Sequence, residues 1–168
     1  MPDLRPVTSK DIAEIKKWPA YSGDFEQMDY ALRENGWLDE FRKRPDTRIF
    51  IAEINEQIVG FGMLIIGAEA DAEFRIAIHP GRTRTGLGRK ITLSMLGKGF
   101  RELNLDIIRL IVRKTNHPAI RLYESLGFEK TGESIHSIQG ERIKFFDMEM
   151  TRNMFNILDL ERNRRIHE

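Results

Sequence analysis

The chain has 168 residues, 40% of them hydrophobic and 32% charged, a balance typical of one soluble globular domain and not of a disordered chain. Its formal net charge of +1 gives no overall attraction to nucleic acid or to a membrane surface. The absence of cysteine excludes disulfides, a thiol nucleophile and zinc–thiolate sites, and because we find neither a signal-peptide core nor a long apolar run we expect a cytoplasmic protein.

The first half of the chain predicts a strand, a helix, an interrupted helical segment and a hairpin. Thr8 and Asp11 form a candidate capping box for the helix, which Pro19 should end. In the next segment apolar residues recur at helical spacing, but Gly23 and the dipeptide at 35–36 interrupt them. The expected ranges are 4–7 for the strand, 8–18 for the helix, 21–44 for the interrupted segment, and 48–54 and 58–66 for the hairpin.

The second half predicts alternating strands and helices. Pro80 stops the first strand, and the next strand is so apolar that we expect it to be central and covered on both faces. Pro118 suits the first turn of a helix that Gly127 ends. The expected strands cover 72–79, 107–112, 128–136 and 142–150, and the expected helices cover 86–103, 118–126 and 154–165. Such interleaving is simplest as one α/β sheet.

A basic turn with two glycines joins the strand at 72–79 to the following helix. Gly86 and Gly88 let the backbone approach a ligand, and the helix behind them directs free N–H groups at the turn. A pyrophosphate could bind there. The nucleoside-triphosphate and dinucleotide motifs are excluded, because Gly-Lys-Ser/Thr is missing and Ile91 stands where a third glycine is needed. A plain loop-to-helix junction with solvated arginines is the alternative.

Two motifs give the chain a resemblance to a known family. Thr83–Gly88 reads Thr-Arg-Thr-Gly-Leu-Gly, close to the pattern Gln/Arg-x-x-Gly-x-Gly/Ala, and Asn116–Phe128 matches Asn-x-x-Ala-x-x-Leu-Tyr-x-x-x-Gly-Phe without a gap. The chain therefore resembles the GNAT superfamily of acyl-CoA-dependent N-acetyltransferases, most clearly from about Phe74 to Gly132. Thr83 departs from the family pattern, where a Gln or Arg leads the loop.

The resemblance implies a fold and a domain. The expected fold is α/β (mixed α+β), with a central mixed, mostly antiparallel twisted sheet of about six or seven strands. About four helices should flank this sheet, and a strand pair should splay apart at the acyl-CoA site. Residues 1–168 are expected to form a single N-acetyltransferase domain, in which 151–168 are a C-terminal helical extension.

The resemblance also implies acetyl-CoA as cosubstrate, without a metal. The backbone of the strand at 74–79 should receive the pantetheine arm, and the glycine-bearing turn should bind the pyrophosphate. Asn116 should contact the cofactor arm, although an N-terminal helix cap is its alternative role. The implied cofactor-binding residues are Ile76, Ala77, Ile78, Arg82, Thr83, Arg84, Thr85, Gly86, Leu87, Gly88, Arg89, Asn116, Ala119 and Tyr123.

Tyr123 matches the family tyrosine that protonates the leaving thiolate. A phenol with a pKa of about 10 is protonated at neutral pH, so it can serve as this acid. Packing of its ring between helix and sheet is the alternative. Glu73 is the first candidate for the base that helps to neutralise the attacking amine, ahead of Glu69, Asp71 and His79.

The predicted activity is transfer of an acetyl group from acetyl-CoA to a primary amine by direct attack. Aromatic and acidic residues in 18–37 suit a cationic acceptor, which is a small amine, a polyamine, or a protein amino terminus or lysine. The alternative is a non-catalytic acyl-CoA-binding regulatory module on the same fold. Nucleic acid is not expected as a partner, because a single basic turn lacks a stripe or an aromatic platform. A membrane is not expected either, because the net charge is only +1. We expect a monomer or a homodimer.

Overall fold

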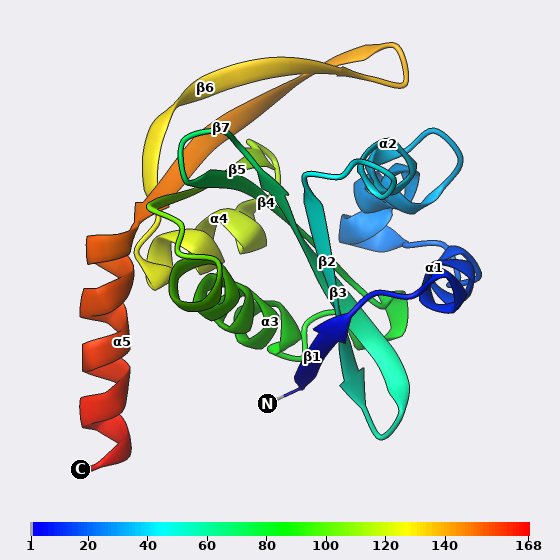
Figure 1. The fold of residues 1–168 in the computed structure, drawn as a ribbon. Coiled ribbons are helices and arrows are strands. Elements are labelled where there is room, and N and C mark those ends of the chain that lie inside the picture. Colours follow the sequence, from blue (N-terminus) through cyan, green and yellow to red (C-terminus); the bar gives the residue numbers. More distant parts are fainter. Residues whose placement is uncertain (1) are drawn as a thin grey trace. The chain divides into compact units, whose positions relative to one another are not determined.

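The computed structural model describes residues 2–168, with the backbone alone described at Asp24. This part of the chain contains seven strands and five α-helices (Figure 1). The strands are β1 Asp3–Pro6, β2 Thr47–Ile54, β3 Gln57–Ile66, β4 Asp71–Ile78, β5 Ile107–Arg113, β6 Glu129–Ile138 and β7 Glu141–Thr151. The helices are α1 Ser9–Lys16, α2 Trp37–Phe41, α3 Leu87–Gly97, α4 His117–Leu126 and α5 Arg152–Ile166. Two 3₁₀ helices, η1 Gly23–Leu32 and η2 Pro80–Arg82, and a π-helical turn, η3 Lys98–Glu102, complete the order.

The strands are hydrogen-bonded in the order β1-β2-β3-β4-β5-β7-β6. The β1–β2, β2–β3, β5–β7 and β6–β7 pairs are antiparallel, and β4 and β5 are parallel. This arrangement confirms the expected mixed, mostly antiparallel sheet, and the five α-helices exceed the expected four by one. The parallel ladder joins residues 71–73 to 107–109, and thus involves the first three residues of β4. A short ladder of this kind fits the expected splayed strand pair.

The contacts within the chain define two compact units. The first contains residues up to Gly67 together with Phe74–Gly97, and the second contains Ala68–Glu73 together with Lys98–Glu168. The boundary falls inside β4 and again where α3 becomes η3. The elements of each unit are described separately below.

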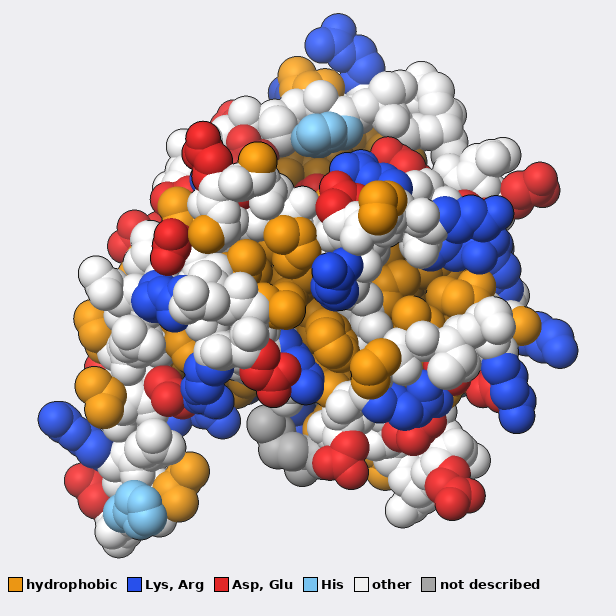
Figure 2. Space-filling model, in the orientation of Figure 1, with side chains coloured by type: hydrophobic (Ala, Val, Ile, Leu, Met, Phe, Trp, Pro, Cys, Tyr) orange, Lys and Arg blue, Asp and Glu red, His pale blue; other side chains and the backbone are white. Residues whose placement is uncertain are grey.

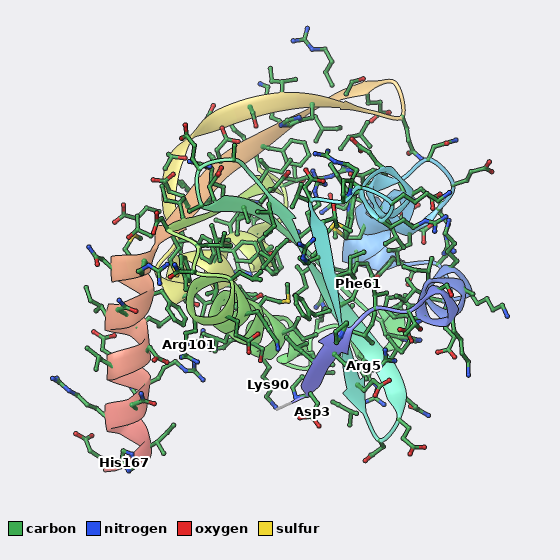
Figure 3. All side chains as sticks on the ribbon, in the orientation of Figure 1. Asp3, Arg5, Phe61, Lys90, Arg101 and His167 are labelled. Atoms are coloured by element: carbon green, nitrogen blue, oxygen red, sulfur yellow. The ribbon has the colours of Figure 1, made fainter. Side chains whose placement is uncertain are left out.

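The core of the first unit is aromatic. Phe61, which extends from β3 and is labelled in Figure 3, has its ring centroid 6.3 Å from Trp18 and 5.8 Å from Trp37. Helix α1 adds Ile12 and Ile15 to this core. Its start is the predicted capping box, because the Thr8 hydroxyl accepts from the Asp11 N–H and the Asp11 carboxylate accepts from the Thr8 N–H.

Two glycines of β3 allow α3 to pack closely on the strand. A Cβ placed on Gly60 would lie 2.8 Å from Cδ1 of Ile91 and 2.9 Å from the carbonyl oxygen of Ala77. A Cβ placed on Gly62 would lie 2.5 Å from the side chain of Met95. The helix that follows the basic turn is therefore held against the strand next to β4.

The segment between α1 and β2 differs from the sequence prediction. A helix with interruptions was expected over 21–44, but η1 is a 3₁₀ helix and α2 is a single short stretch. Gly23 and Asn35 adopt left-handed φ values of 60° and 64°, which break the chain at the two predicted points. Between them i to i+3 hydrogen bonds replace the α-helical pattern, as in the bond from Arg33 N–H to Tyr30 carbonyl.

The second unit buries one face of its sheet. Leu110 of β5 and Met148 of β7 are buried partners in the ladder, whereas Arg109 is exposed. The expectation that β5 is covered on both faces was therefore wrong, because alternate residues point away from the core. In α5, which confirms the predicted terminal helix, the ring of Phe155 stacks on Phe100 at 5.0 Å.

Acidic and basic side chains are spread over the visible face of the molecule, with hydrophobic side chains between them (Figure 2). No helix within residues 2–168 is both long and apolar enough to cross a membrane.

Candidate functional site

The turn between β4 and α3 is fixed by its own side chains. Nδ1 of His79 accepts from the N–H of Gly81 at 2.9 Å, and the hydroxyl of Thr85 donates to the carbonyl of Arg82 at 2.5 Å. Arg84 and Gly86 adopt left-handed φ values of 62° and 82°, and a Cβ at Gly86 would meet no atom within 4 Å. The turn therefore exposes its backbone beside open space.

Helix α3 directs its first amides at this turn. Lys90 N–H donates to the carbonyl of Gly86 at 3.3 Å, so the N–H groups of residues 87–89 precede this bond of the helix. The partial positive charge of a helix N-terminus adds to these donors. Strand, turn and helix have the local geometry that the pyrophosphate prediction requires.

Two arginines of the turn already contact other side chains of the first unit. Nη2 of Arg82 donates to Oε1 of Gln57 at 3.4 Å, and the guanidinium of Arg84 lies 5.4 Å from the ring centre of Phe25. The Arg82 hydrogen bond is exposed, and the Arg84 contact is a cation–π interaction. A phosphate could displace either contact, because its hydrogen bonds to a guanidinium are stronger. The hydroxyl of Thr83 donates to the carbonyl of Pro80 at 3.4 Å, which gives this residue a structural role within the turn.

The backbone N–H and C=O groups of successive residues in β4 point to opposite edges of the strand, as in any β-strand. His79 N–H donates to the carbonyl of Val59 in β3 at 2.9 Å, so the N–H and C=O groups of Ile78 point away from β3. The same alternation applies to Ile76. The hydroxyl of Tyr21 donates to the carbonyl of Ile78, a contact between residues 57 positions apart that sequence patterns do not predict.

Tyr21 belongs to a clamp that organises η1. Oδ1 of Asp29 accepts from the N–H of Tyr21 at 3.1 Å and from Nη2 of Arg33 at 2.8 Å. The hydrogen bond from Arg33 holds the pKa of Asp29 below its usual value, and burial raises the pKa of Tyr21 above its usual value. Asp29, one of the acids expected to suit a cationic acceptor, is thus paired within the protein.

His79 is poorly suited to act as a base. Because its Nδ1 accepts from Gly81, the neutral ring carries its proton on Nε2 and has no lone pair left to offer. Burial and the nearby Arg82 lower the pKa of His79. Its ring packs edge-on against Trp18 at 5.0 Å, beside a cavity of about 410 Å³ that α1, the β2–β3 turn and the loop after β4 line.

In the second unit, α4 has the predicted start and end. Oδ1 of Asn116 accepts from the N–H of Ala119 at 3.3 Å, so the helix-cap role of Asn116 is confirmed. Gly127 ends the helix with a φ of 103°. Tyr123 is 7% exposed and packs edge-on against Phe128 at 5.6 Å, and burial raises the pKa of its phenol above the usual value. The phenol therefore stays protonated at neutral pH.

Glu73 lies directly opposite Arg109 in the ladder between β4 and β5. Nη1 of Arg109 donates to Oδ2 of Asp71 at 2.6 Å, and its Nε lies 3.7 Å from Oε2 of Glu149. The pKa of Asp71 is lowered by the N–H of Glu69 and by Arg109. Asp71 is therefore an ion-paired acid, which weakens its case as a base.

The Acetyltransferase (GNAT) family model matches residues 10–128, a range that includes the turn, α3 and α4. The chain belongs to the GNAT acetyltransferase family. It is similar to the mycothiol acetyltransferase of Thermobispora bispora, with 36% identity over 111 residues, 58% of this chain and 37% of the relative. It is also similar to the spermidine N(1)-acetyltransferase of Escherichia coli K12, with 36% identity over 91 residues, 53% of this chain and 49% of the relative. The chain thus spans between about a third and a half of the length of these relatives.

Solved structures share the GNAT fold over nearly the whole chain. The spermidine/spermine N-acetyltransferase of Vibrio cholerae in complex with manganese ions has a TM-score of 0.72 and 25% identity, covering 91% of this chain and 94% of that one. A chimera of the Vibrio cholerae spermidine enzyme has a TM-score of 0.73 at 24% identity, which shows the fold alone. Among residues 2–168 of the GNAT chain, no group of three or more His, Asp or Glu side chains is arranged to hold a metal ion.

The predicted site residues divide between the two units of this GNAT chain. The first unit contains the β4 backbone positions 76–78 and the turn and helix start at 82–89, and the second contains Glu73, Asn116, Ala119 and Tyr123. Sequence reasoning included Tyr21 among the aromatic residues of 18–37 but did not foresee its hydrogen bond to β4. It missed a hydrogen-bonded group on β6 and β7 that consists of Ser134, His136 and Asp147. The spacing of 134 and 136 within a predicted strand indicated a shared face, but only the register with β7 brings Asp147 beside them.

Proposed function

We propose that this GNAT chain transfers an acetyl group from acetyl-CoA to a primary amine. The neutral amine attacks the thioester carbonyl, a nitrogen–carbon bond forms, and the carbon–sulfur bond breaks after a tetrahedral intermediate. The thiolate of coenzyme A then takes up a proton. The observation that supports the proposal is the turn after β4, whose exposed backbone and first α3 amides would bind an anion in a chain of this family.

We assign the cofactor to the residues that the sequence identified. The N–H and C=O groups of Ile76 and Ile78 would pair with the amides of the pantetheine arm, as an added strand does, and Ala77 lies between them. The turn from Arg82 to Arg89 would hold the pyrophosphate through its amides. Asn116 would contact the arm while it caps α4. The match of one family model to residues 10–128, in both compact units, supports a single functional domain.

Two side chains would move the protons. Tyr123 would protonate the departing sulfur, because its buried phenol carries its proton throughout the neutral pH range. Glu73 would accept a proton from the attacking amine, directly or through water. An amine with a pKa of about 10.4 costs roughly 4–5 kcal/mol to be neutral at pH 7, and the base would offset part of that cost.

Spermidine is the first acceptor to test, because the chain is similar to enzymes named for its acetylation. We infer that the protein works in the cytoplasm as a monomer or a homodimer, with neither nucleic acid nor membrane as a partner. The near-neutral net charge supports this inference.

Calorimetric titration with acetyl-CoA tests the proposed cofactor site. We expect a dissociation constant in the micromolar range, about −7 to −8 kcal/mol. Gly88→Glu should abolish binding, since its carboxylate would occupy the pyrophosphate position, whereas Ser137→Glu, which adds the same charge at an exposed position of β6, should leave binding unchanged. Normal affinity in the Gly88→Glu protein would remove the turn from the site.

A non-catalytic acyl-CoA-binding module is the second candidate. It is favoured by Thr83, which replaces the family Gln or Arg and donates to Pro80 within the turn. Such a module would bind coenzyme A saturably and transfer no acetyl group to any amine in a broad panel. Loss of the thioester that one particular amine stimulates would exclude it.

A further inference from the structure

The strands of the second unit have a second face that mixes polar side chains with apolar ones, among them the buried Phe145. The core face contains buried residues such as Leu110 and Met148, and the opposite face contains their neighbours in the alternation. In the ladder Arg109 pairs with Glu149, and the next residues on this face are Ile111 and Asp147. This face therefore carries two carboxylates along β7, those of Asp147 and Glu149, with one residue between them in the sequence.

The two carboxylates have different partners. Glu149 lies 3.7 Å from the guanidinium of Arg109, which also pairs with Asp71. Asp147 instead accepts a hydrogen bond of 2.7 Å at Oδ1 from the hydroxyl of Ser134, and Nε2 of His136 lies 3.0 Å from that hydroxyl oxygen. Because Ser134 gives its proton to Asp147, the histidine is the donor in the second bond. Oδ1 is thus oriented by a neutral donor, and no ion pair to Asp147 occurs among the described residues.

The second oxygen of Asp147 lies beside a glycine of β6. The register of β6 against β7 shifts between Lys130 and Gly132, which is a β-bulge, and Gly132 comes to lie opposite Asp147. A Cβ on Gly132 would lie 3.6 Å from Oδ2. Glycine therefore leaves open a space that any other residue would fill in van der Waals contact with this oxygen.

We propose that Asp147 binds the ammonium group of the acceptor amine as it arrives. A half-buried carboxylate without a cationic partner favours a cation, and a charge-assisted hydrogen bond to Oδ2 would orient it. Ser134 and His136 are positioning residues, because they fix Oδ1 and leave Oδ2 for the ligand. The proposal rests on the proposed function and specifies its acceptor class, a primary amine that is cationic when it binds.

Binding of amines is measured separately from acetyl transfer. The full-length protein is titrated with spermidine and with n-butylamine by NMR, with and without coenzyme A, so that no turnover occurs. We expect Asp147→Asn to weaken spermidine binding at least tenfold, about 1.4 kcal/mol. Gly132→Ala, which keeps every charge and covers Oδ2, should weaken it severalfold. Glu141→Gln removes an exposed carboxylate from the same strand and should change it less than twofold.

Further arms separate binding from folding and from the cofactor site. Ser134→Ala keeps the carboxylate but removes the donor to Oδ1, so it should weaken spermidine binding about two- to fivefold, and thermal unfolding checks that each variant is folded. The proposal would be overturned if wild type and Asp147→Asn bound spermidine equally well, or if Glu141→Gln lost as much affinity as Asp147→Asn. It would also be overturned if the wild-type protein bound neither amine saturably. Failure to bind acetyl-CoA would contradict only the proposed function, because the amine titration is also run without cofactor.

Discussion

Tyr21 and Tyr123 are both buried phenols, yet their contacts suit them to different roles. The hydroxyl of Tyr21 donates to the carbonyl of Ile78, which anchors η1 to β4. Tyr123 packs its ring on Phe128 at the end of α4. Burial raises the pKa of both phenols, so each keeps its proton well above neutral pH. Tyr123 is therefore an acid that keeps its phenolic proton throughout the neutral pH range.

Tyr123→Phe tests the acid role at this residue. We expect turnover to fall about 10- to 100-fold, at the lower end for a general acid because a thiolate is a tolerable leaving group. The affinity for acetyl-CoA should stay within twofold, since the ring packing on Phe128 is kept. The wild-type rate should show no loss from Tyr123 ionisation between pH 7 and 10. Steady-state kinetics across this range measure both effects, and unchanged turnover in the variant would remove Tyr123 from the mechanism.

Single elements were predictable where local chemistry decides them. The capping box of Thr8 and Asp11, the cap at Asn116 and the left-handed end at Gly127 were all read from neighbours in the sequence and are present. The 3₁₀ form of η1 was not predicted, because the spacing of apolar residues does not distinguish a 3₁₀ helix from an interrupted α-helix. The Ser134–His136–Asp147 group was missed for the same reason, since strand register cannot be derived from spacing.

The packing of α3 on β3 gives a graded prediction. Gly60→Ala should destabilise the protein by about 2–3 kcal/mol, because the new Cβ would meet the backbone oxygen of Ala77 as well as Ile91. Gly62→Ala should cost about half as much, because it meets only the flexible side chain of Met95. Urea unfolding of both variants gives the comparison, and a larger loss at Gly62 would contradict this account of the helix–strand contact.

At the scale of the molecule, carboxylates paired with cations make stability depend on pH. Hydrogen bonds from Arg5 hold the pKa of Asp11 well below its usual value, and Lys16 lowers that of Asp39. An acid with a lowered pKa in the folded state stabilises the fold above its unfolded pKa of about 3.9, and this contribution is lost as the pH falls below that value. Most acid sensitivity should therefore appear between about pH 5 and pH 2.

Asp11→Asn should reduce this acid sensitivity. Asp11 is only 4% exposed, but Arg5 is partly exposed, so solvent weakens the interaction between them. We therefore expect the substitution to cost about 1–2 kcal/mol of stability at pH 7. The cost should shrink as the pH falls from 4 to 2, because the Asp11 carboxyl of the unfolded chain takes up a proton in this range, whereas its lowered pKa keeps the carboxyl of the folded chain ionised to lower pH. Denaturant unfolding of both proteins at pH 7, 4 and 2 tests this expectation. A difference that is constant with pH would mean that the stability of α1 comes from packing and not from the charge.

The ring pair of Trp18 and His79 also gives the molecule an intrinsic optical signal. The chain has two tryptophans, and Trp18 stands edge-on to the histidine from which the turn begins. A rearrangement of that turn on binding an anion would change the surroundings of one indole while Trp37 stays against Phe61. Emission at one wavelength would then follow ligand entry in real time, without a dye, a label or a coupled assay. Rapid-mixing fluorescence could time this step before any acceptor is known.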